Sequence, residues 1–123
     1  WLDEGMGSCL LRDAGARSYL EQALMKFQGE RVEHLSWVIM PNHVHLLFVP
    51  KAGLSELMRA WKGSSARWIG KGVIWQANYR DTLIRNARHF ATVVRYIRKN
   101  PVKARLHEGE FTLWESERAR AVE

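Results

Sequence analysis

Two histidines separated by one residue, His43 and His45, are the side chains of this sequence best suited to metal chemistry. They lie in the segment HVHLLFVP, where apolar residues alternate with others as they do in a β-strand. In a strand, residues i and i+2 point to the same face, so two imidazoles can converge on one ion. Two imidazoles do not complete the four-ligand sphere of a structural zinc site, so an open, catalytic site fits better. The alternative is two unrelated strand histidines, one exposed and one packed.

The spacing of apolar residues predicts the elements that position this pair. Helices are expected over Tyr19–Phe27, over Ser55–Ile69 and from Asn86 to Asn100-Pro101, with Asn86 as an N-cap and Pro101 as a stop. Strands are expected at 8–11, within 31–40 and over 43–50, the last two joined as a hairpin by the turn-forming Pro41-Asn42. Residues 79–84 are either a short strand or an extended lead-in.

Helices alternating with strands around a central hairpin predict an α+β fold, with helices packed on an antiparallel sheet. The order βαββα with a further strand is ferredoxin-like. The sequence opens on Trp1 rather than on Met, so we leave open that the first strand of this fold is missing from it. We expect residues 1–106 to form a single domain and 107–123 to be a charged C-terminal tail.

The charge balance favours a phosphate-bearing partner. The chain has 19 Lys and Arg against 13 Asp and Glu, a net charge of +6. The single cysteine, Cys9, allows no internal disulfide framework and no cysteine pair for a zinc finger. No apolar run approaches the length of a membrane helix, and no signal peptide is evident at the start, so we expect a cytoplasmic protein without a membrane partner.

Three blocks in a fixed order carry a family resemblance: WVIMPNHVHLLFVP, then WQANYRDTLIR, then YIRKNPVKARL. Together they resemble the IS200-like, single-tyrosine HUH transposases, and among them the REP-associated tyrosine transposases. The resemblance implies that His43 and His45 bind Mg²⁺ or Mn²⁺ against a phosphate of single-stranded or hairpin DNA. It also implies that a tyrosine attacks this phosphate, leaving a 5′-phosphotyrosine bond and a free 3′-hydroxyl for strand transfer.

The sequence contains three tyrosines that could be this nucleophile. Tyr19 lies among apolar residues of an expected helix and is explained by packing. Tyr79 lies in a polar stretch beside Arg80 and Asp81, where a hydroxyl can reach substrate, and the resemblance points to this position. We therefore expect Tyr79 to attack. Tyr96, on the third expected helix, is the alternative.

Further ligands and DNA contacts can be proposed by residue type. Asp81 is the carboxylate nearest to Tyr79 and a hard oxygen donor suited to magnesium, although a loop-capping role also explains it. Thr82 stands where the resemblance implies a larger basic or imidazole side chain, so the sequence departs from the family here and the third ligand stays open. The expected DNA contacts, basic side chains for phosphates and a tryptophan for base stacking, are Lys62, Trp75, Arg80, Arg85 and Lys103.

Two other functions stay open at this point. A regulatory DNA-binding relative without catalysis would keep the basic surface and the hairpin. A metal-dependent nuclease would cleave DNA without a covalent intermediate. Neither the DNA sequence recognised nor the choice between a monomer and a homodimer follows from the sequence.

Overall fold

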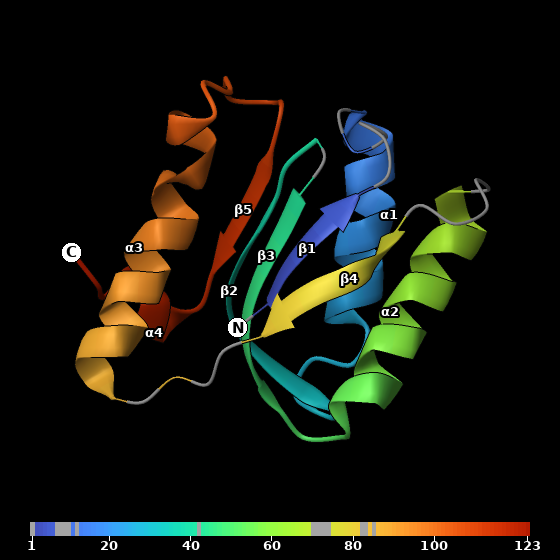
Figure 1. Cartoon of the computed structure of the whole chain (residues 1–123), viewed down its shortest axis with the longest axis horizontal. Coiled ribbons are helices and arrows are strands. Elements are labelled where there is room, and N and C mark those ends of the chain that lie inside the picture. Colours follow the sequence, from blue (N-terminus) through green and yellow to red (C-terminus); the bar gives the residue numbers. More distant parts are fainter. Residues whose placement is uncertain are drawn as a thin grey trace.

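The structure is a computed structural model that describes residues 2–6, 11, 13–41, 43–69, 75–81, 84 and 86–123, without the side chains of 2–6, 63–69 and 75–81. Nine elements follow one another in this description: β1 (Leu2–Met6), α1 (Ala14–Met25), β2 (Val32–Ile39), β3 (His43–Pro50), α2 (Leu54–Ile69), β4 (Trp75–Asp81), α3 (Ala87–Lys103), β5 (Thr112–Glu115) and α4 (Glu117–Arg120). Figure 1 shows them along the chain.

The strands form an antiparallel sheet in the order β4-β1-β3-β2-β5. The first six elements, βαββαβ with strand order 4-1-3-2, are the ferredoxin-like arrangement predicted from the sequence. The strand that we left open as missing is present: Leu2–Met6 pairs with both β3 and β4. The short strand expected at 8–11 falls mostly on residues 8–10, which lie outside the described residues.

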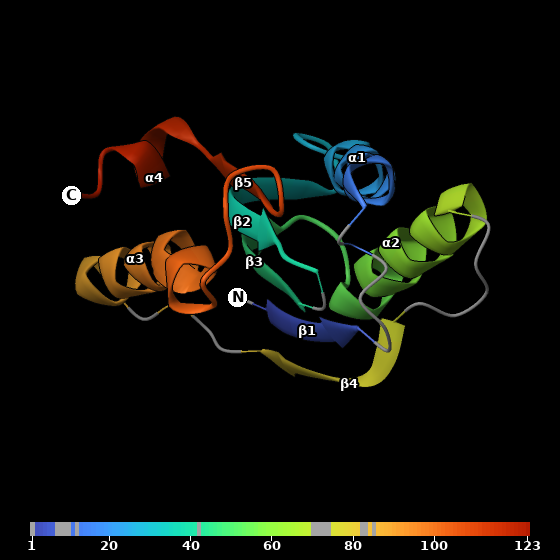
Figure 2. The ribbon, with the colours of Figure 1, turned by 90° about the horizontal axis from the view of Figure 1, so that it is seen from above.

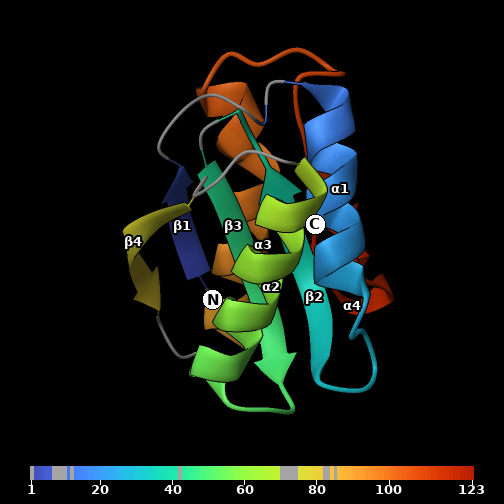
Figure 3. The same ribbon diagram turned by 90° about the vertical axis from the view of Figure 1, so that its right-hand side faces the viewer.

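The sheet separates two helical layers, seen from above in Figure 2 and from the side in Figure 3. Helices α1 and α2 cover one face, and α3 and α4 cover the other. Each face has its own core. Trp37, Val44, Leu46 and Trp61 are among the buried residues of the α1/α2 side, and Val38, Leu47, Val94 and Ile97 are among those of the α3/α4 side. Among the described residues, no helix is long and apolar enough to span a membrane.

Side-chain N-caps stand at the start of α1, α3 and α4, and α1 spans Ala14–Met25, so it begins and ends earlier than the predicted Tyr19–Phe27. The Asp13 carboxylate accepts a hydrogen bond from the Ala16 amide at 3.0 Å at the start of α1. The Asn86 side chain accepts one from the His89 amide at 2.9 Å at the start of α3, which confirms the predicted cap. The predicted stop at Pro101 was wrong by a few residues, because α3 continues to Lys103 with the Pro101 ring buried in the helix.

The segment 107–123 does not form the charged tail that we expected. It contributes β5, which pairs with β2, and the short helix α4. Arg98 of α3 binds it through hydrogen bonds to the Glu115 carboxylate at 3.0 Å and to the carbonyls of Val122 and Ala119 at 2.8 and 3.0 Å. The segment is therefore part of the fold.

Candidate functional site

The β2–β3 hairpin presents the two histidines. Met40 donates a backbone hydrogen bond to the His43 carbonyl at 2.8 Å, which closes the hairpin just before the pair. Val44, between the histidines, is buried in the α1/α2 core, so both imidazoles lie on the α3 side, as the strand spacing predicted. The two rings are stacked, with centroids 6.0 Å apart and planes 13° from parallel. The hairpin thus holds them as one unit.

Helix α3 brings Tyr96 to this pair. The Tyr96 ring meets the His45 ring edge to face, with a centroid separation of 5.5 Å and an angle of 90°. His45 is 3% exposed, whereas Tyr96 is 39% exposed. Since α3 packs its apolar stripe on the sheet, Tyr96 lies at the edge of that stripe, between the buried imidazole and solvent. Histidine pair and tyrosine meet here within a single chain.

A groove of about 490 Å³ continues from Tyr96 along α3. The Lys103 ammonium lies 5.8 Å from the centroid of the Tyr96 ring, within the range of a cation–π contact. The groove is lined by Thr92, Arg95, Tyr96, Lys99, Val102 and Lys103. Lys103, predicted to contact DNA, is therefore next to the candidate site.

The residues predicted in the WQANYRD segment form β4, at one edge of the sheet. Tyr79 pairs with Glu4, which pairs with Val44, so its register position is that of the residue between the histidines. Arg80 lies in register with Asp3 and His45. The backbone places Trp75 and Asp81 at the two ends of the strand. The side chains of all these β4 residues lie outside the described part of the chain.

Of two further predicted DNA contacts, the structure describes only one. Lys62 lies on α2, which covers the face of the sheet opposite the histidines, so the structure does not bring it to the pair. Arg85 lies outside the described residues. Tyr19, which we expected to pack in or near the core, is 41% exposed on α1.

The donor set around the pair is incomplete among the described side chains. No cluster of three or more His, Cys, Asp or Glu residues that could hold a metal occurs there. The Nδ1 atoms of His43 and His45 are both buried. The two imidazoles can therefore serve as nitrogen donors, while oxygen donors would come from another residue, water or a phosphate.

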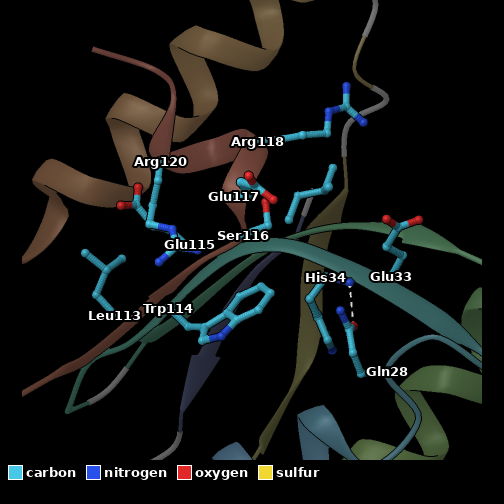
Figure 4. A pocket seen from close by; sticks show the side chains of 11 residues that line it. Gln28, Glu33, His34, Leu113, Trp114, Glu115, Ser116, Glu117, Arg118 and Arg120 are labelled. Atoms are coloured by element: carbon cyan, nitrogen blue, oxygen red, sulfur yellow. Dashed lines mark hydrogen bonds between the residues drawn. The ribbon is translucent and has the colours of Figure 1, made fainter.

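A second hollow, of about 700 Å³, lies at the edge of the sheet where β5 gives way to α4 (Figure 4). Its lining mixes charges of both signs, with Glu33 and Glu117 against Arg118 and Arg120. Gln28 in its wall accepts a hydrogen bond from the His34 amide at 2.8 Å. The α3 groove differs, because all its charged lining residues are basic.

One signal in the sequence could have pointed to Tyr96. Tyr96, Lys99 and Lys103 follow the i, i+3, i+7 spacing of one helix face, next to the apolar stripe that contains Val93 and Ile97. A tyrosine at the border between an apolar and a basic stripe can pack against the core on one side and contact an anion on the other. The position of this border relative to the histidines required the tertiary structure.

Comparison with known proteins identifies relatives of this chain. Residues 11–100 match the model of the family described as "Transposase IS200 like". The chain belongs to this family. It is 30% identical over 88 residues, 68% of this chain, to a REP-associated tyrosine transposase from Escherichia coli strain K12, and 26% identical over 110 residues to an uncharacterised protein from Haemophilus influenzae.

A solved structure shares the fold of this member of the IS200-like family. It is that of a REP-associated tyrosine transposase bound to a REP hairpin, with a TM-score of 0.73 and 28% identity over 84% of this chain and 66% of that one. Our chain spans 53% and 60% of the lengths of the two curated relatives.

Proposed function

We propose that this member of the IS200-like family cleaves and rejoins single-stranded DNA next to a hairpin, through a covalent bond between Tyr96 and a 5′ phosphate. The observation that carries the proposal is the contact between the Tyr96 and His45 rings, at 5.5 Å, on the face of the sheet that presents both histidines. The hairpin substrate is supported by the solved relative, which is bound to a REP hairpin. Tyr79, our prediction from the sequence, is the second candidate for the nucleophile.

The chemistry that we assign to Tyr96 is a transesterification. Its phenolic oxygen forms a bond to phosphorus, the bond from phosphorus to the 3′ oxygen breaks, and the phenolic proton passes to solvent while the leaving 3′ oxygen becomes a hydroxyl. A different 3′-hydroxyl then reverses the step and joins new strands. One ester replaces another, so no nucleotide hydrolysis is required. The partial exposure of Tyr96 gives a phosphate access to its ring edge.

We assign His43 and His45 to hold a divalent ion, Mg²⁺ or Mn²⁺, which when bound supplies Lewis acidity to the phosphate oxygens. Their rings share one face and are nearly parallel, so small rotations of each side chain can converge their nitrogens. Asp81 is the predicted oxygen donor. Asn100, one helical turn beyond Tyr96 on α3, is a second candidate because residues four apart share a helix face.

Covalent capture tests the nucleophile. The protein is incubated with Mn²⁺ and a labelled single-stranded oligonucleotide that carries an Escherichia coli REP hairpin with single-stranded flanks, and adducts are separated under denaturing conditions. We expect an adduct with the wild-type chain that disappears in Tyr96→Phe, because removal of the hydroxyl removes the attacking atom. Tyr19→Phe, an exposed tyrosine on α1, is the matched control and should keep the adduct.

The other outcomes point to a different nucleophile or to a different function. An adduct that persists in Tyr96→Phe and vanishes in Tyr79→Phe moves the role to Tyr79. Cleavage without any adduct indicates a nuclease, and binding without cleavage indicates a regulatory DNA-binding protein. The first result contradicts the assignment of Tyr96, and either of the last two contradicts the proposed strand transfer.

Metal binding is measured separately, without DNA. Titration of Mn²⁺ followed by electron paramagnetic resonance should show one site in the wild-type chain. Loss of one of two imidazole donors should weaken binding by about tenfold or more in His43→Ala or His45→Ala. His107→Ala, a histidine of the loop before β5, is the control and should bind as the wild type does. Equal affinity in all four proteins would show that the pair is not the metal site.

A further inference from the structure

The groove along α3 has a charge pattern that the catalytic assignment does not explain. Arg95, Lys99 and Lys103 line it, and no acidic residue is among the described side chains that do so. Tyr96 and Val102 are its apolar residues, 39% and 74% exposed respectively. An exposed valine between lysines, in a groove that shares Tyr96 with the histidine pair, suggests a partner that combines negative charge with flat apolar surface.

We propose that this groove binds the unpaired DNA strand next to the cleaved phosphate, with phosphates on Lys99 and Lys103 and bases or sugars on Tyr96 and Val102. The inference rests on the proposed function, because it assigns Tyr96 to the cleavage site. It adds a binding surface of defined residues for this strand.

The mixed lining favours a single strand over a duplex. In a duplex the base faces are stacked inside and the surface presents mainly phosphates, so the apolar side chains of the groove would have no base face to contact. An unpaired strand exposes its base faces, which stack on aromatic and apolar side chains while cations hold the backbone. The aliphatic stems of Lys99 and Lys103 extend the apolar floor beside Val102.

The length of the groove limits how much strand it can hold. Thr92 and Lys103 mark its ends along the helix, and eleven steps at about 1.5 Å each give roughly 16 Å. This length corresponds to about five nucleotides at the stacked spacing of about 3.4 Å per nucleotide. A more extended strand would fit fewer.

Oligothymidine probes of increasing length test the groove without requiring cleavage. Binding to the full chain is followed by fluorescence anisotropy in a buffer without divalent metal, so the result is independent of adduct formation. We expect affinity to rise with length up to about five nucleotides and then to level off. We expect a duplex closed into a hairpin by a short loop and long enough to stay paired in this buffer to bind more weakly.

Charge variants identify the surface. Lys99→Met with Lys103→Met keeps the apolar stems and removes two cations, so the slope of log affinity against log salt should fall by about 1.4. Affinity at low salt should fall by about tenfold. The paired variant with Lys99→Arg and Lys103→Arg should restore both quantities. Lys51→Met is the control: this exposed lysine follows β3 and lies against Gly29, and its loss should leave oligothymidine binding unchanged.

Three results would overturn the inference. The first is a wild-type chain that does not bind oligothymidine, and the second is equal binding of single strand and duplex. The third is an unchanged salt slope in the paired methionine variant. A Tyr96-dependent adduct in the capture experiment, combined with any of these results, would support Tyr96 as the nucleophile and reject the groove as the DNA-binding surface. Normal oligothymidine binding without an adduct would keep the groove and remove the nucleophile.

Discussion

His34 shows how burial alone can determine the charge of a single side chain. Its ring lies between aromatic side chains, 5.7 Å from the Trp61 ring and 6.2 Å from the Phe48 ring between centroids. Its Nε2 is 2.8 Å from the Leu24 carbonyl oxygen and donates a hydrogen bond to it. Burial lowers the pKa of His34 from 6.5 to about 4, although the hydrogen bond to Leu24 acts in the opposite direction. The folded chain therefore keeps this histidine neutral.

This pKa predicts an acid-sensitive fold. The unfolded chain binds a proton at His34 below pH 6.5, and the folded chain does so only near pH 4. The free energy of unfolding therefore decreases as pH falls through this interval, by about 2 kcal/mol between pH 7 and 5 from this residue. Urea unfolding at both pH values measures the difference.

The matched variant for this measurement is His34→Gln. It does not titrate, and its loss of packing lowers stability at both pH values alike. The difference between pH 7 and pH 5 should therefore shrink by about 2 kcal/mol in the variant. The same difference in both proteins would mean that other groups cause the acid sensitivity.

Residue-level predictions from the sequence succeeded where geometry is local. The i, i+2 spacing of His43 and His45 was enough to place both imidazoles on one face, which the stacked rings confirm. The choice between tyrosines was not local. Tyr96 meets His45 only because α3 crosses the same face of the sheet. The spacing of residues along the sequence does not predict this contact.

The helices and strands that the sequence predicted are those whose own residues carry the signal for the element. The hairpin and the three long helices carry alternation, helical apolar spacing and, for α3, the Asn86 cap. Strand β5 has only four residues, and Trp114 is stabilised by stacking on Trp37 at 6.0 Å, a contact between distant segments. A strand that depends on a partner so far away in the sequence was mistaken for part of a tail.

At the level of the whole molecule, residues 107–123 connect the two helical layers. Arg17 of α1 donates hydrogen bonds to the Thr112 hydroxyl at 3.2 Å and to the Gly109 carbonyl. Arg98 of α3 binds Glu115 with a nitrogen-to-oxygen distance of 2.9 Å. One arginine from each side of the sheet therefore holds the same segment, and we expect it to unfold together with the rest of the chain.

Hydrogen exchange of the β5 amides tests this expectation. Amides in β5 that bond to β2 should exchange as slowly as those of β2, because both are released by the same unfolding event. Arg98→Met removes a charged donor that binds three acceptors, at a cost of about 2 kcal/mol, so exchange in β5 should become about thirtyfold faster. Arg88→Met, an exposed arginine in the first turn of α3, should leave it unchanged. Exchange of the β5 amides at the rate of an unstructured peptide in the wild-type chain would show that the segment is a tail after all.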